Sequence, residues 1–387
     1  MNFFKNLKIT SQKQQILFLL FLWAVVQGLL IRQYGIVTNL EATKYIDEAN
    51  HLLQFGSLST NNYYLYSTEI LLIAVAIKLH LGFSVIVVVQ LLLNLLATIM
   101  FYKLSLFFLN MRLLATAASV FFIINMPYQS YTSYLFTESI FYSLTIIYSS
   151  YVLRLEKLDL KNWIFILLFA ALLSITRPTG ILFFVSTLLY IFFRFLNNIR
   201  LLYKIILISV SLVVCLMAIN TMLQAGGSFD FMLPFKKENI ICGVNTVNNA
   251  DIKTIEKGNS IQGIVYYIFN NKEQFLRLAG LKTLAFFGML RTYFSLFHNI
   301  LLVLFFYPFY ILSFIGLWKK IKQQKNSLIY ITSIILLYWV TTLLTCDDWH
   351  NRFILTVSPF LFLLGFAAFC RKASLSRENY NGESPGD

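Results

Sequence analysis

Residues 15–32 read QILFLLFLWAVVQGLLIR, an apolar run that ends at Arg32. A helix rises about 1.5 Å per residue and the hydrocarbon core of a bilayer is about 30 Å thick, so roughly 20 such residues cross it. Lys5, Lys8 and Lys13 precede the run, and no small-residue cleavage pattern follows it. We therefore predict a retained first transmembrane helix whose N-terminus is cytoplasmic.

The rest of the 387-residue chain has the same character. Hydrophobic residues make up 58% of it and charged residues 12%, and the mean hydropathy is +0.71; soluble domains are only about 45–50% apolar. The predicted fold class is an all-α polytopic membrane protein with about ten transmembrane helices, which excludes a soluble enzyme or a single-anchor protein. The predicted spans are 15–33, 83–102, 112–127, 138–153, 162–177, 180–195, 204–222, 299–318, 326–345 and 352–370.

The charged residues predict how these helices are oriented. With the N-terminus inside, about 18 of the 31 Lys and Arg residues fall in the short inner segments, as the positive-inside rule requires. About 12 of the 17 acidic residues then fall outside, so chemistry is expected on the outer face. The net charge of +14 is scattered between apolar runs, which argues against a nucleic-acid partner. We expect a multi-pass protein of the bacterial inner (cytoplasmic) membrane with both termini cytoplasmic.

One membrane domain, residues 1–370, is predicted to hold all these helices. It includes two long outer segments, 34–82 and 223–298, and a disordered cytoplasmic tail, 371–387, follows it. Residues 68–79 are apolar enough to pass for another span, but a span there would invert every later loop and turn the basic clusters outward. We therefore predict a short helix in the outer membrane interface.

A second outer interfacial helix is predicted at residues 41–56. The stretch begins with Glu41 and ends at Gly56, as a helix with a C-terminal glycine does. Its apolar positions share one face through i, i+4, i+7 and i+8 spacing. They are Tyr45, Ala49, Leu52 and Leu53. We expect this helix to lie flat on the membrane.

Four cysteines are too few for a disulfide scaffold. Cys215 and Cys370 lie in apolar runs, where a thiol acts as a small hydrophobic group. Cys242 and Cys346 would both face the exterior, where disulfides persist. Whether they pair stays open.

Polar residues at the outer ends of predicted spans are the candidates for function. Glu138 has apolar sequence on both sides, and Arg177 lies in a turn between two spans. Charges in such places are costly, roughly 2.5–3.5 kcal/mol at mid-bilayer, so neither is expected to face lipid. Glu138 is interpreted either as a carboxylate facing a cavity or as a helix-capping acid. Arg177 is interpreted either as a phosphate ligand or as a side chain that extends to lipid headgroups.

A third candidate cluster, residues 346–353, is a short polar turn before the last span. Its adjacent Asp347 and Asp348 suit a metal, although solvated turn acids are commoner. Arg352 opens an apolar helix where an anionic lipid headgroup would lie. The sequence has no phosphate-binding glycine loop, no His/Cys metal-ligand spacing and no nucleophile elbow. Three histidines are interpreted as interfacial or structural: His51, His80 and His298.

Several short motifs follow one another in a set order along the chain. They are an outer acid-to-glycine helix with Glu41, Tyr45, Ala49 and Gly56; the tyrosines Tyr63, Tyr64 and Tyr66; Thr137-Glu138; Arg177-Pro178; and a last helix with Arg352 and Pro359. This order resembles the GT-C superfamily of membrane glycosyltransferases over residues 15–370. The likeness is to bacterial relatives of protein O-mannosyltransferases and of lipid A aminoarabinose transferases.

The resemblance implies a GT-C-like bundle that glycosylates components of the cell envelope. Such an enzyme moves a sugar from a polyprenyl-phosphate donor to a lipid, glycan or protein acceptor on the outer face, by inverting displacement. It implies Glu41 and Glu138 as catalytic carboxylates, either of which could act as the base, although Glu41 stands where the family usually has Asp. The implied donor-phosphate or substrate ligands are Lys44, Tyr45, Arg177 and Arg352. No cofactor is certain; a divalent cation is compatible with the chemistry, but no cage of ligands demands one.

The chemistry of the implied reaction agrees with these residue types. A sugar on a lipid phosphate leaves behind an anionic phosphate, which needs cations, and the acceptor hydroxyl needs a carboxylate to orient or deprotonate it. Two other functions stay open. A lipid-linked-sugar flippase or transporter would need charges or broken helices within several spans, and few are found. A polysaccharide polymerase or ligase would need an Arg-rich outer loop, and 223–298 holds only Arg277 and Arg291.

Overall fold

The chain is built from helices, as predicted. The computed structural model describes residues 11–195, 232–244, 252–255 and 258–370, with a few isolated positions between 206 and 220. Within these residues the only extended pairings are two isolated bridges. The predictions for residues 1–10, for the span at 204–222 and for the tail at 371–387 lie outside the described residues.

Five stretches of helix among the described residues are long and apolar enough to cross a membrane, which fits a membrane protein. Four are single helices and the fifth joins a short 3₁₀ turn to an α-helix. They are α1 (Gln12–Tyr34), α4 (Ser84–Leu109), η4 (Pro178–Gly180) with α9 (Ile181–Phe195), α14 (Leu296–Lys320) and α15 (Lys325–Leu344).

The count of ten spans is not supported. Four of the predicted spans are helices of only 12 to 17 residues, which cover about 18–26 Å of a hydrocarbon core about 30 Å thick. They are α5 (Arg112–Ile123), α7 (Thr137–Leu153), α8 (Leu160–Thr176) and α16 (Arg352–Ala367). Proline explains one of the short lengths, because Pro178 holds Arg177 in extended backbone directly after α8. Helix α5 is followed by the short helix α6 (Met126–Gln129), which has Pro127 at its second position.

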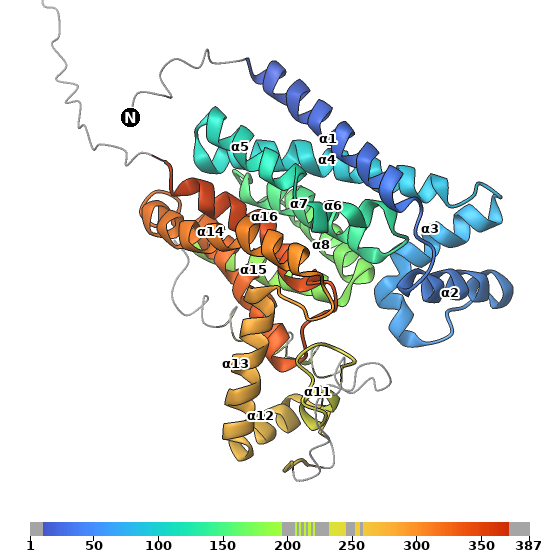
Figure 1. Cartoon of the computed structure of the whole chain (residues 1–387). Coiled ribbons are helices and arrows are strands. Elements are labelled where there is room, and N and C mark those ends of the chain that lie inside the picture. The colour runs from blue at the N-terminus through green and yellow to red at the C-terminus, as the bar shows by residue number, and fades with distance from the viewer. Residues whose placement is uncertain are drawn as a thin grey trace, which may run out of the picture.

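Helices α7 and α16 form the centre of the bundle. All residues of α16 except Phe353 are buried, and so are nearly all of those in α7. Figure 1 shows the two helices enclosed by α4 and α5 on one side and by α14 and α15 on the other. Helices α14 and α16 pack closely at Gly316, where an added Cβ would lie 1.8 Å from the Leu364 carbonyl oxygen. Glu138 and Arg352 therefore stand on the two most enclosed helices.

Helices α2 (Glu41–Phe55) and α3 (Ser67–Lys78) lie together at one end of the bundle (Figure 1), joined by η2 (Asn61–Tyr66). Both helices begin and end within one residue of the predicted bounds, and Gly56 ends α2 in the left-handed conformation with φ +73°. Of the predicted apolar face, Tyr45 and Ala49 are buried in the fold, whereas Leu53 is 40% exposed. Glu48 is buried instead, because its carboxylate accepts two hydrogen bonds of 2.6 Å from Ser59 in the following turn.

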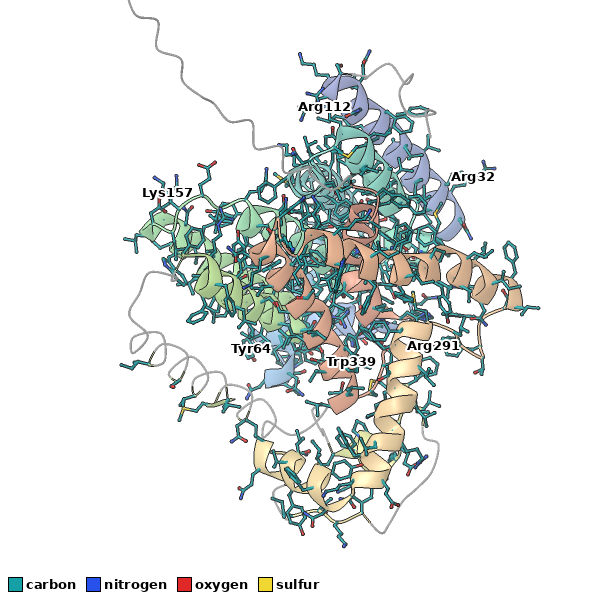
Figure 2. The ribbon with its side chains drawn as sticks, turned by 90° about the vertical axis from the view of Figure 1, so that its left-hand side faces the viewer. Arg32, Tyr64, Arg112, Lys157, Arg291 and Trp339 are labelled. Atoms are coloured by element: carbon teal, nitrogen blue, oxygen red, sulfur yellow. A yellow bond between two sulfur atoms is a disulfide. The ribbon has the colours of Figure 1, made fainter. Side chains whose placement is uncertain are left out.

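The described residues between 232 and 293 form a small unit beside the bundle (Figure 1), which we call the outer unit because these residues belong to the predicted outer segment 223–298. It contains α11 (Leu233–Lys236), α12 (Ile261–Asn270) and α13 (Lys272–Gly288). Its own apolar core is Met232, Phe235, Tyr267 and Leu278. Helix α13 joins it to the bundle through Trp339 of α15, whose indole donates to the Thr283 hydroxyl at 3.0 Å (Figures 1 and 2). Cys242 and Cys346 form a disulfide, which decides the pairing that the sequence left open.

Candidate functional site

Glu138 lies at the centre of a charged cluster. It stands in the first turn of α7 and is 0% exposed. One carboxylate oxygen, Oε1, accepts hydrogen bonds from Arg177 and, at 2.7 Å, from Arg352, and the other accepts a long one from the Thr137 hydroxyl at 3.4 Å. No side-chain hydrogen bond caps α7, although Glu138 lies in its first turn, where the helix dipole favours a negative charge. The buried carboxylate is also the shared counter-ion of two guanidinium groups.

Arg352, the first residue of α16, joins three parts of the fold. Its Nη1 donates to both Glu41 and Glu138, and its Nε lies 3.7 Å from a carboxylate oxygen of Asp348. The guanidinium carbon is 5.3 Å from the centre of the Phe136 ring. With its side chain only 9% exposed, the fork of this arginine holds carboxylates from α2, from α7 and from the turn before α16.

Arg177 reaches the same cluster from the end of α8. Pro178 restricts the preceding residue to extended backbone, and Arg177 has φ −152° and ψ 144°. Its side chain, 12% exposed, pairs with Glu138 and lies 3.5 Å from Asp348. Because these partners lie inside the fold, the alternative in which Arg177 extends to lipid headgroups is not supported. Gly180 keeps this turn tight, since an added Cβ there would lie 2.4 Å from the carbonyl of Leu173.

Glu41 forms the more exposed side of the cluster. Its carboxylate accepts hydrogen bonds from Arg352, from Lys44 and, at 3.0 Å, from the Tyr45 hydroxyl. The Lys44 ammonium also lies over the rings of Tyr45 and Tyr66, at 4.8 and 5.5 Å from their centres. Burial opposes ionisation of Glu41, but the charges of Arg352 and Lys44 outweigh it and lower the pKa of Glu41 from 4.5 to about 2. Glu41 is therefore ionised at neutral pH.

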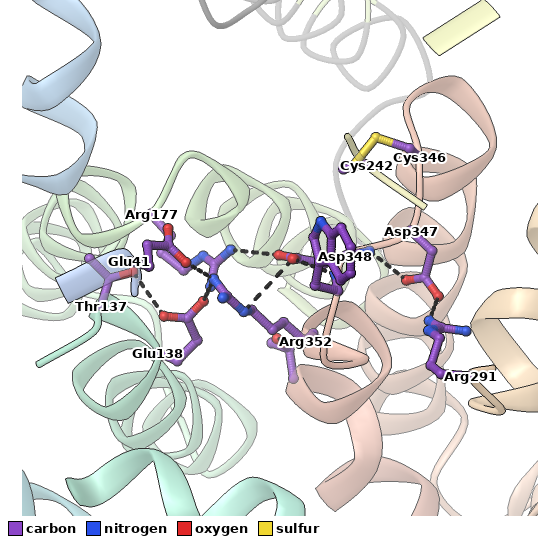
Figure 3. A network of polar contacts seen from close by, with 12 residues as sticks. Glu41, Thr137, Glu138, Arg177, Cys242, Arg291, Cys346, Asp347, Asp348 and Arg352 are labelled. Atoms are coloured by element: carbon purple, nitrogen blue, oxygen red, sulfur yellow. Dashed lines mark hydrogen bonds and ion pairs between the residues drawn. A yellow bond between two sulfur atoms is a disulfide. The ribbon is translucent and has the colours of Figure 1, made fainter. Parts of the chain in front are cut away.

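The two adjacent aspartates of the last turn face different cations (Figure 3). Asp348 lies near both Arg177 and Arg352, whereas Asp347 pairs with Arg291 of the outer unit. The arrangement does not support the interpretation of the two acids as a joint metal site. Sequence reasoning missed Asp348 as a partner of the arginines. The available signal was its position four residues before Arg352, although this spacing brings side chains together only where the backbone turns suitably.

The structure thus brings all six predicted site residues into one connected group. Figure 3 shows four of them, Glu41, Glu138, Arg177 and Arg352. Glu41 and Arg352 are 311 positions apart in the chain and are directly bonded. Among the described residues, no group of three or more His, Cys, Asp or Glu side chains is arranged to hold a metal ion. Comparisons of the chain with protein families, with curated proteins and with solved structures give no match.

Proposed function

We propose that the chain is a membrane glycosyltransferase that moves a sugar from a polyprenyl-phosphate donor to a lipid, glycan or protein acceptor. One observation carries the proposal. Arg352 contacts both Glu41 and Glu138, and Arg177 lies beside it, so cations for a phosphate and carboxylates for a hydroxyl share one site. Direct displacement at the anomeric carbon needs these two kinds of group and no enzyme nucleophile.

The donor phosphate is assigned to the cationic side of the cluster. Arg352, Arg177 and Lys44 supply three positive charges, which the carboxylates of Glu41, Glu138 and Asp348 balance in the resting protein. Guanidinium forks bind phosphate oxygens with the same bidentate geometry as carboxylate oxygens. A donor phosphate therefore replaces a carboxylate at the arginines, and the negative charge that develops on the leaving phosphate stays paired.

The two glutamates are assigned different roles because they differ in exposure. The Glu41 side chain is 21% exposed, so it is able to reach an acceptor hydroxyl, whereas Glu138 is fully enclosed. Once the phosphate shares Arg352 and Lys44, those cations hold the pKa of Glu41 less strongly below 4.5, and its carboxylate becomes a better base. Glu138 then serves to hold the two arginines in place. Both were expected to be catalytic carboxylates, and this assignment leaves only Glu41 in contact with the acceptor.

The site is assigned to the outer, extracytoplasmic face of the inner membrane. The Cys242–Cys346 disulfide adjoins the cluster, since Cys346 lies two residues before Asp348. Disulfides persist in oxidising compartments and are rare in the cytosol. This supports the same orientation as the positive-inside pattern, with both termini cytoplasmic.

The proposal is tested by transfer of label from a panel of radiolabelled undecaprenyl-phosphate sugars, using purified protein in lipid with Mg²⁺ or with EDTA. Glu41→Gln and Arg352→Ala are compared with wild type, and Glu69→Gln is the control because this buried glutamate has no ion pair among the described residues. The proposal is supported if transfer is lost in Glu41→Gln and Arg352→Ala and is retained in Glu69→Gln. Full activity in Glu41→Gln would overturn the assigned base, and labelled lipid that crosses the bilayer without transfer would favour a flippase.

A further inference from the structure

Backbone hydrogen bonds join the turn that carries Asp348 to the outer unit. Asp347 donates its amide to the Ile240 carbonyl at 2.8 Å, and Cys242 donates its amide to the Asp347 carbonyl at 2.8 Å. These two bonds form one of the isolated bridges. The Cys242–Cys346 disulfide lies directly beside them. A segment 104 positions away in sequence therefore fixes the turn covalently as well as by hydrogen bonds.

A buried ion pair fastens the same turn a second time. Arg291 and Asp347 are paired with almost no exposure of either side chain. Arg291 also donates to the carbonyl oxygens of Ala285 and Leu290, at 3.1 and 3.2 Å, at the end of α13. The other oxygen of Asp347 accepts the amide of Asp348 at 2.9 Å. One carboxylate thus links the end of α13 to the backbone of the residue that faces both site arginines (Figure 3).

Two further bonds complete the attachment. The Tyr293 hydroxyl donates to the Trp349 carbonyl at 3.2 Å, and the Asn351 side chain donates to the Met289 carbonyl at 2.8 Å. The turn is therefore held by the outer unit on two sides while the Asp348 side chain stays directed at the cluster. A role in stability alone does not require this chemistry, because buried ion pairs are weak contributors that apolar side chains often replace without loss.

We propose that Arg291, Asp347 and the Cys242–Cys346 disulfide form a brace that positions Asp348 and, through the turn, Arg352. The brace residues are positioning residues that touch no substrate themselves. The outer unit thereby controls how well the two site arginines are held for an anionic ligand. The effect of the brace on donor binding rests on the proposed function, but its hold on the turn does not.

The experiment measures two quantities on the same purified, full-length protein in lipid. The first is amide hydrogen exchange in residues 346–352, and the second is affinity for undecaprenyl phosphate. Wild type is compared with the double variant Cys242→Ser/Cys346→Ser, with and without Asp348→Asn. Cys370→Ser is the matched control, because Cys370 is a free buried thiol whose Sγ lies against the Leu109 carbonyl.

If the brace holds the turn, loss of the disulfide raises exchange in residues 346–352 by about tenfold or more, and it weakens undecaprenyl-phosphate binding by roughly 3- to 10-fold. In the Asp348→Asn background the same loss causes no further weakening, because the brace acts through Asp348. Cys370→Ser changes neither quantity. Arg291→Gln combined with Asp347→Asn gives the same pattern as loss of the disulfide.

The remaining outcomes separate failure of the brace from failure of the proposed function. Unchanged exchange in residues 346–352 would overturn the brace whatever the protein binds. Raised exchange with unchanged binding, or additive weakening in the Asp348→Asn background, would show that the brace does not position the site. If wild type fails to bind undecaprenyl phosphate, the proposed function is wrong, and the exchange data still decide whether the outer unit holds the turn.

Discussion

Replacing Glu138 by Gln removes the negative charge that two enclosed arginines share, and the structure sets the size of the effect. Loss of one partner from a buried ion pair costs about 3–5 kcal/mol. Arg352 retains Glu41 and Asp348 as acidic partners, whereas Arg177 retains Asp348 alone among the described residues, at 3.5 Å. Because each arginine still has a carboxylate nearby, we expect a loss of stability at the lower end of this range, about 3 kcal/mol. This corresponds to a fall in Tm on the order of 5 °C.

Glu69 provides the matched control for this substitution. It lies on α3, is as fully buried as Glu138, and accepts a single long hydrogen bond from Gln90 at 3.4 Å. Burial and the nearby charge of Glu138 raise the pKa of Glu69 well above 4.5. Glutamine has nearly the same shape as glutamic acid, and Glu69 forms no ion pair with any described residue, so this substitution removes none. We therefore expect Glu69→Gln to change stability by less than about 1 kcal/mol.

The assay is thermal unfolding of both variants and wild type at pH 7 in one detergent, followed by tryptophan fluorescence. We expect a large fall in Tm for Glu138→Gln and little change in Tm for Glu69→Gln. Equal Tm changes in the two variants would refute the argument that pairing with Arg177 and Arg352, rather than burial, decides the cost. A Glu138→Gln protein as stable as wild type would refute the assignment of Glu138 as their shared counter-ion.

Three more outcomes follow from the geometry. Arg352→Lys replaces a fork with a single ammonium, so undecaprenyl-phosphate affinity measured by titration falls at least about tenfold; unchanged affinity contradicts the bridging role. The lowered pKa of Glu41, about 2 against 4.5, contributes stability that is lost as pH falls from 4.5 towards 2; the Tm of wild type therefore falls more steeply on acidification than that of Glu41→Gln. Gly180→Ala forces a Cβ against the Leu173 carbonyl and lowers Tm, whereas Gly28→Ala, with open space at Cβ, does not.

Local signals in the sequence were enough to place some helices and not others. The ends of α2 were predictable because Glu41 and Gly56 mark them directly. The length of α5 was not, because the apolar run continues to residue 127 while the backbone leaves the helix after Ile123. Hydropathy counts residues that avoid water, and it does not register where the chain bends. The outer unit was hardest to predict, since its core of four side chains forms only when distant segments meet.

The candidate site was likewise predictable from the sequence only in part. Charged residues at the ends of apolar runs were recognisable one by one, and the order of the motifs grouped them. Their pairing was not predictable. Asp347 and Asp348 are neighbours in sequence, yet Asp347 pairs with Arg291, which is 56 positions earlier. Asp348 instead faces Arg177 and Arg352. Nothing local separates two adjacent aspartates, because the difference arises from which cation the fold brings to each side of the turn.

Burial itself explains why these residues had to converge. An unpaired charge in a site of low dielectric costs several kcal/mol, and α7 and α16 place Glu138 and Arg352 where almost no water reaches them. Such a chain folds stably only if opposite charges from other segments complete the pairing. Glu41 and Arg177 do so from the ends of α2 and α8. In an apolar chain, isolated charges at helix ends therefore predict that a shared cluster exists, whereas its internal geometry is fixed by the packing of the helices that carry them.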